Sequence, residues 1–176
     1  MSASAIRTAL VALLPGRRAD ADTYWLALGL VALADGVRMS VLSGPSALFW
    51  WLAVLFLVAS IHMNRLRDAG RPSWFASAPI LGASAAKLMV ATGAAASAIF
   101  PLYRDFIQRQ GVNMSDPEQV NAAFADPELQ SAFQSALLAD TERAQQIAQA
   151  GDWPSMLAFW AVIILGGMWF ANLRRP

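Results

Sequence analysis

The sequence predicts an all-α, polytopic membrane protein with four transmembrane helices, an N-terminal amphipathic helix and a helical periplasmic insertion between helices three and four. Composition is the first reason: of 176 residues, 57% are hydrophobic and only 14% are charged. Soluble domains average roughly 45–50% apolar and about 25% charged residues. The second reason is the presence of four long apolar segments, and the third is the way in which arginines gather at particular connections between them.

The N-terminal residues 2–14 form a short apolar run that ends at Pro15-Gly16-Arg17-Arg18. A signal peptide would end in a small-residue cleavage site rather than in a double arginine. We therefore expect an amphipathic helix on the membrane surface, with a disordered terminus as the alternative. Its lipid-facing residues would be Ile6, Leu10, Leu13 and Leu14.

Each of the four apolar segments approaches the length of about 20 residues that a helix needs to cross roughly 30 Å of hydrocarbon. The segments are 23–42, 46–64, 74–102 and 154–173. They are too long and continuous for the strands of a barrel, which leaves helices as the structure that satisfies the backbone in lipid. Between the first two, Ser43-Gly44-Pro45-Ser46 predicts a tight turn, so these spans form an antiparallel hairpin.

Arginine distribution predicts the orientation of the chain. The clusters are Arg7, Arg17 and Arg18, then Arg65, Arg67 and Arg71, and finally Arg174 and Arg175. Cytoplasmic loops carry an excess of basic residues, and four spans place all three clusters on one side. We therefore predict a bacterial inner-membrane protein with both termini in the cytoplasm. The predicted regions are 1–102 (interfacial helix and three spans), 103–153 (periplasmic cap) and 154–176 (fourth span and basic tail).

The predicted cap contains a short internal repeat. Asp116-Pro117-Glu118 and Asp126-Pro127-Glu128 lie ten residues apart. Aspartate is a good N-cap, proline suits the first helical position, and an acidic residue suits the positive end of a helix. Each copy should therefore begin a helix, and the second helix should run towards Gly151. A floppy loop is the alternative.

The segment Arg65-Leu66-Arg67-Asp68-Ala69-Gly70-Arg71-Pro72-Ser73-Trp74 resembles a motif of a bacterial inner-membrane family, the domain of unknown function 805. Gly16-Arg17-Arg18 followed by Tyr24-Trp25 is similar to a second motif of that family, and the resemblance covers roughly residues 15–90. The family's histidine is replaced by Arg67, and its glycine- and asparagine-rich tail is not evident. The resemblance implies a polytopic membrane protein and no particular activity.

Four ionisable residues in or beside the spans are candidate functional groups, because charge inside a bilayer is costly. Asp35 and Arg38 are three residues apart and can pair on one helix face. Lys87, near the middle of the third span, is expected to face protein, to pair with Asp35 or to snorkel. His62 is expected to be an interfacial residue, with a proton relay as the alternative.

A basic cluster in the second connection is the other candidate site. It consists of Arg65, Arg67, Asp68 and Arg71. These residues can determine topology, or they can bind the anionic headgroups of lipids.

The sequence contains no recognisable catalytic or cofactor motif. It has no cysteine and a single histidine, which excludes thiolate chemistry and a multi-histidine metal site. No nucleophile elbow, zinc-protease motif or phosphate-binding loop is present. We therefore expect no catalytic residue, cofactor or metal, and no nucleic-acid partner because the arginines form no long basic stripe.

Three functions compete at this point. The favoured one is a non-enzymatic accessory, scaffold or assembly subunit of a membrane complex. The expected partners are the lipid bilayer and either another membrane protein, which suits this role, or further copies of the chain, which suit the alternative. The alternative is a small oligomeric transporter or channel in which Asp35, Arg38 and Lys87 line a polar path. A lipid-acting enzyme at the arginine-rich loop ranks last, because it lacks a nucleophile or a metal site.

Overall fold

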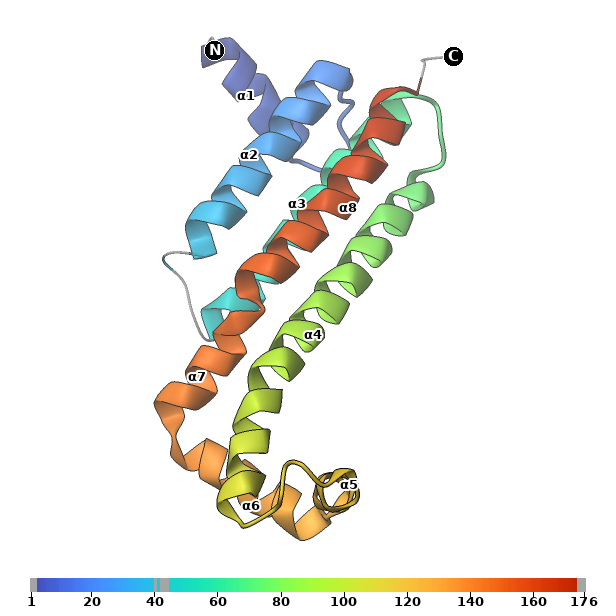
Figure 1. Ribbon diagram of the computed structural model, residues 1–176. Helices are drawn as coiled ribbons and strands as arrows, with labels where there is room; N and C mark the ends of the chain where they lie inside the picture. The colour runs from blue at the N-terminus through green and yellow to red at the C-terminus, as the bar shows by residue number, and fades with distance from the viewer. Residues whose placement is uncertain (1–2, 40, 42–44, 174–176) are drawn as a thin grey trace. The chain divides into compact units, whose positions relative to one another are not determined.

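The computed structural model describes residues 3–39, 41 and 45–173 (Figure 1). These residues form helices and no strand, which confirms the all-α class for this part of the chain. The helices are α1 (Ala3–Ala12), α2 (Ala21–Met39), α3 (Pro45–Asp68), the 3-10 helix η1 (Ser73–Ala76), α4 (Ser77–Arg109), α5 (Pro117–Ala125), α6 (Pro127–Ala139), α7 (Thr141–Ala150) and α8 (Asp152–Ala171). Leu42 at the end of the first predicted span, Ser43 and Gly44 of the predicted hairpin turn, and Arg174 and Arg175 of the basic tail lie outside the described residues.

The chain divides into two compact units. The first comprises Met1–Lys87 and Met156–Pro176, and the second comprises Leu88–Ser155. Helix α4 contributes to both, since the boundary falls after Lys87. The first unit is therefore a helical bundle, and the second contains the polar segment predicted as a cap.

The bundle buries apolar residues from α1, α2, α3 and α8. Its largest fully buried side chains include Leu28 of α2, Ile61 and Leu66 of α3, and Phe159 and Ile163 of α8. Ala9 and Ala12 of α1 are also buried in this core, while Ile6, Leu10 and Leu14 are exposed. The predicted N-terminal helix is therefore present, with small residues towards the bundle and Ile6, Leu10 and Leu14 outward, whereas Leu13 packs partly against the core.

Glycine allows the helices of the bundle to approach closely. A Cβ atom at Gly166 of α8 would lie 2.6 Å from Cβ of Pro79 in α4, and one at Gly167 would lie 2.8 Å from Oη of Tyr24. At Gly82 the nearest atom, in Val162, is 3.6 Å away, which is an ordinary contact. Among these three glycines, the closest approaches therefore come from Gly166 and Gly167 of α8.

Three described segments are long and apolar enough to cross a membrane, which indicates a membrane protein. They are Ser46–Asp68, Ser73–Arg109 and Thr141–Ala171. The first predicted span, α2, is not among them because its 19 residues include Asp22, Asp35 and Arg38. The third predicted span differs in detail, since it begins with η1 and its α-helix continues through Pro101 to Arg109.

Two predicted helix starts in the second unit are confirmed. The side chain of Asp116 accepts hydrogen bonds from the backbone of Glu118 and Gln119 at the start of α5. Asp126 does the same for Glu128 and Leu129 at the start of α6. In both, proline occupies the first turn, as the repeat predicted.

The prediction of one long helix running from the second repeat towards Gly151 was wrong. The chain breaks at Asp140, which ends α6 and whose side chain accepts a hydrogen bond from the backbone N–H of Arg143 in α7. Asp140-Thr141-Glu142 is a third acidic cap in which threonine replaces proline. The capping aspartate offers the backbone an alternative partner, which favours a new helix start over continuation.

Candidate functional site

Asp35 lies in the bundle with three donors around it. Its side chain belongs to α2 and the residue is 1% exposed. Nε1 of Trp50 in α3 lies 3.0 Å from Oδ1, and Nε1 of Trp160 in α8 lies 2.9 Å from Oδ2. The ion pair expected from the sequence is also present, with Nη2 of Arg38 at 3.4 Å from Oδ1. The carboxyl group thus joins three helices through charge-assisted hydrogen bonds.

Lys87 lies beside an aromatic ring of α3. Its Nζ is 4.9 Å from the centroid of Trp51, which places a cation over a π-face. Trp51 in turn packs edge-on against Phe159, with ring centroids 4.7 Å apart. Lys87 therefore faces protein, which is one of the three placements that the sequence left open.

His62 is buried inside the bundle. It is 0% exposed, and its Nδ1 lies 3.2 Å from Oη of Tyr24. Its ring packs edge-on against Phe170 at a centroid distance of 5.0 Å. Its Nε2 has no hydrogen-bond partner among the described residues. His62 therefore faces the interior of the bundle, where Tyr24 of α2 and Phe170 of α8 contact it.

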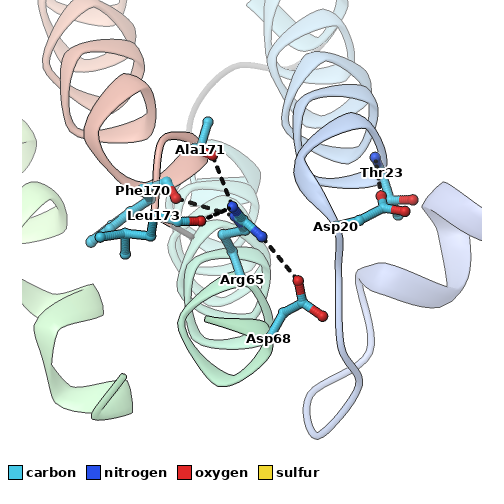
Figure 2. Close-up of polar contacts among 7 residues, drawn as sticks. All are labelled: Asp20, Thr23, Arg65, Asp68, Phe170, Ala171 and Leu173. Carbon is cyan, nitrogen blue, oxygen red and sulfur yellow. Dashed lines mark hydrogen bonds and ion pairs between the residues drawn. The ribbon is translucent and has the colours of Figure 1, made fainter. Parts of the chain in front are cut away.

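Arg65 caps the C-terminus of α8 (Figure 2). Its Nε donates to the carbonyl of Phe170 at 3.1 Å, and its Nη2 donates to those of Ala171 at 2.8 Å and Leu173 at 2.6 Å. Its Nη1 pairs with Oδ2 of Asp68 at 2.9 Å. The last carbonyls of a helix have no partner within that helix and carry partial negative charge. A guanidinium group, with its fork of donors, suits several of them at once.

Asn64 performs the same task for α1. Its Nδ2 lies 2.8 Å from the carbonyl oxygens of both Ala12 and Leu14. Consecutive residues of α3 therefore close the C-terminal ends of two different helices. α3 itself ends in a Schellman motif, in which Gly70 has φ +64° and the N–H of Arg71 reaches the carbonyl of Leu66.

The structure separates the four residues of the predicted basic cluster into two pairs. Arg65 is 4% exposed and Asp68 is 7% exposed, so both lie within the bundle. Arg67 and Arg71 are exposed. A Cβ atom at Gly16 would lie 3.6 Å from Nη1 of Arg67, which brings the Gly16-Arg17-Arg18 segment beside this connection. Only the exposed pair is available to a lipid headgroup.

Several polar partners were not identified from the sequence. They are Tyr24, Trp50, Trp160 and Asn64. In the sequence, tryptophan and tyrosine are interpreted as apolar residues of a span or as interfacial aromatic residues. Their role as hydrogen-bond donors becomes evident only when the structure places a carboxyl group or an imidazole of another helix beside them. Tyr24 is fully buried.

Among the described residues, no group of three or more His, Asp or Glu side chains could hold a metal ion. No family model, curated protein or solved structure matches the chain. The arrangement of the polar residues is therefore the basis for a functional proposal.

Proposed function

We propose that this chain is a non-enzymatic accessory, scaffold or assembly subunit of a membrane complex in a bacterial inner membrane. In this proposal α2, α3, α4 and α8 cross the bilayer, both termini are cytoplasmic, and residues 103–153 form a periplasmic cap. The resemblance of residues 15–90 to the domain of unknown function 805 belongs to the same proposal. One observation carries it: an open, small-residue face on α4.

That face lies between residues 84 and 102, where no side chain is buried. Thr92, Gly93, Ala96 and Ser97 are all exposed, and a Cβ atom built at Gly93 has no neighbour within 4 Å. Small residues let two helix backbones approach in a bilayer, where close packing replaces the hydrophobic effect as the driving force. This face fits a helix from a partner protein.

The internal contacts of the charged residues support a structural role over a transport path. Asp35 and Arg65 are almost completely buried, and their hydrogen bonds go to Trp50, Trp160 and the end of α8. A polar path needs groups that a passing ion or substrate can reach. These contacts instead hold the bundle together.

The second unit exposes more acidic than basic side chains, and this acidic excess is a further feature that suits docking. The exposed acids are Asp105, Glu118, Glu128, Asp140, Glu142 and Asp152, and the exposed bases are Arg104, Arg109 and Arg143. An acidic surface steers a basic partner surface and contributes to the choice of partner more than to affinity.

The test is affinity purification of the tagged chain from native membranes in a mild detergent, followed by mass spectrometry. We expect a membrane protein in stoichiometric amount with the wild type. Gly93→Leu should abolish its recovery, because the added side chain occupies the space that a partner helix needs. Gly29→Leu is the matched control, since Gly29 is also an exposed helical glycine with no neighbour within 4 Å.

A chain that purifies alone and as a monomer contradicts the proposal. A homo-oligomer without another protein would favour the transporter, and Lys87 would then be the residue to replace. Equal recovery of the partner with Gly93→Leu and Gly29→Leu would remove α4 as the interface.

A further inference from the structure

A groove lined by aromatic residues lies within the second unit, and we call it the aromatic groove. α4 supplies Ala96, Ile99, Phe100 and Tyr103, α5 supplies Phe124, and α6 supplies Phe133. Its volume is about 400 Å³, which falls in the range of roughly 300–1,000 Å³ that small-molecule sites occupy. The ring centroid of Tyr103 lies 5.0 Å from the ring centroids of Phe124 and Phe133, so contacts with Tyr103 hold these two walls of the groove in place.

The groove offers its occupant almost no hydrogen-bond donors. The hydroxyl of Tyr103 donates to the carbonyl of Ala123 at 2.9 Å. Gln130, the other polar residue of the lining, donates through Nε2 to the carbonyl of Phe124 at 2.6 Å. No charged residue lines the groove. Recognition there depends on contact with hydrocarbon, and a peptide backbone would lose its hydrogen bonds to water without replacement.

The floor of the groove belongs to a segment that can cross a membrane. Residues 96–103 of α4 lie in the candidate span Ser73–Arg109, and no charged side chain occurs between Leu88 and Tyr103. Phe100 is 56% exposed. If α4 crosses the bilayer, the medium that borders this face consists of lipid chains.

We infer that the aromatic groove binds an acyl chain of a bilayer lipid. The acyl chain contacts α4 on one side and Phe124 and Phe133 on the other. It thereby holds α5 and α6 of the second unit at the membrane. This inference rests on the proposed insertion of α4 and does not require the accessory role, although Ala96 belongs both to the groove lining and to the small-residue face. It goes beyond that role by assigning a lipid ligand to the second unit.

The test uses the full chain in phosphatidylcholine vesicles in which part of the lipid carries a diazirine near the end of an acyl chain. After irradiation, mass spectrometry locates the adducts. We expect adducts on Phe124 and Phe133, in addition to those on the exposed residues Ile164 and Leu165 of α8. Ile99→Trp should abolish the adducts on Phe124 and Phe133 because the larger ring fills the groove. The α8 adducts should be unchanged.

Leu88→Trp is the matched control. Leu88 is 68% exposed and lies eleven residues before Ile99, which is about three turns and therefore the same face of α4. This variant should retain the groove adducts. A wild type that gives adducts on α8 and none on Phe124 or Phe133 would overturn the lipid inference but not the proposed insertion. This result does not depend on whether Ile99→Trp folds. Equal groove adducts in both tryptophan variants would also overturn it, and absence of α8 adducts would overturn the proposed insertion as well.

Discussion

Asp35 is retained inside an apolar bundle because donors from three helices surround it. A buried carboxyl group costs free energy unless its oxygens are hydrogen-bonded. Here Oδ1 has Arg38 and Trp50, and Oδ2 has Trp160. Removal of the Trp160 donor therefore leaves Oδ2 buried and unsatisfied, which is costlier than the net value of the hydrogen bond itself.

Replacing Trp160 with phenylalanine tests this directly. An aromatic ring remains, although phenyl is smaller than indole, and Oδ2 of Asp35 loses the N–H at 2.9 Å. We expect the free energy of unfolding to fall by about 1–3 kcal/mol, measured by circular dichroism during titration of the solubilised protein with sodium dodecyl sulfate. Trp153→Phe is the control, because Trp153 is 51% exposed. Equal effects of the two variants would show that the indole N–H of Trp160 is unimportant.

Arg65 and Arg67 are the same residue type two positions apart on one helix, and the structure gives them different surroundings. Arg65 donates to three carbonyls at the end of α8, whereas Arg67 is exposed. The sequence predicted a basic cluster as a whole. It could not distinguish these residues, because the difference depends on a helix that lies about a hundred positions later.

We expect Arg65→Lys to loosen the last turn of α8. An ammonium group cannot reproduce the planar fork that reaches Phe170, Ala171 and Leu173. Hydrogen exchange followed by mass spectrometry should therefore show faster exchange in residues 166–173, together with a loss of about 1–3 kcal/mol in stability. Arg67→Lys should leave both unchanged. Slow exchange in the Arg65→Lys variant would contradict the capping role of the guanidinium group.

At the level of helices, the sequence predicted positions well where a local signal was available. Apolar length located α3, α4 and α8, and Asp-Pro-Glu located the starts of α5 and α6. The break at Asp140 was missed because threonine there lacks the strong signal of proline. Burial of His62 and Tyr24 was missed because it depends on packing between helices, and a single span has no marker for the face that another helix will cover.

Two helical glycines, one at a helix contact and one in open space, should change stability in opposite directions when replaced with alanine. A Cβ atom at Gly166 would lie 2.6 Å from Cβ of Pro79, whose ring cannot move away. We expect Gly166→Ala to lower stability by about 1–3 kcal/mol. Gly29→Ala meets no atom within 4 Å and should raise it by up to about 1 kcal/mol, since alanine favours the helix. Thermal unfolding in detergent measures both, and a stabilising Gly166→Ala would contradict close packing of α4 and α8.

For the molecule as a whole, the number of spans depends on α2. Three described segments have the length and composition of a span, and α2 carries three charged residues. The buried contacts of Asp35 reduce the cost of placing α2 in lipid, because its carboxyl group is already hydrogen-bonded within the bundle. We therefore retain four spans as the prediction.

The absence of cysteine allows a direct test of this topology. Arg17→Cys and Ser115→Cys each introduce one thiol at an exposed position. With four spans, a membrane-impermeant maleimide added to intact cells with a permeable outer membrane should label Ser115→Cys only. Arg17→Cys should react only after the inner membrane is opened. Labelling of both variants in intact cells would show that α2 does not cross, since α1 and the basic connection would then lie on opposite sides.

The cap that Arg65 provides has a consequence for biosynthesis. Arg65 is separated by 105 residues from Phe170, whose carbonyl it binds. During translation α3 is therefore complete well before α8 exists, and until then the guanidinium group of Arg65 lacks those carbonyl partners and keeps only its pair with Asp68. The hydrogen bonds between Arg65 and the end of α8 form once α8 has been made. A chain whose synthesis stops before α8 would lack this link between the two helices, which distinguishes an unfinished copy from a finished one.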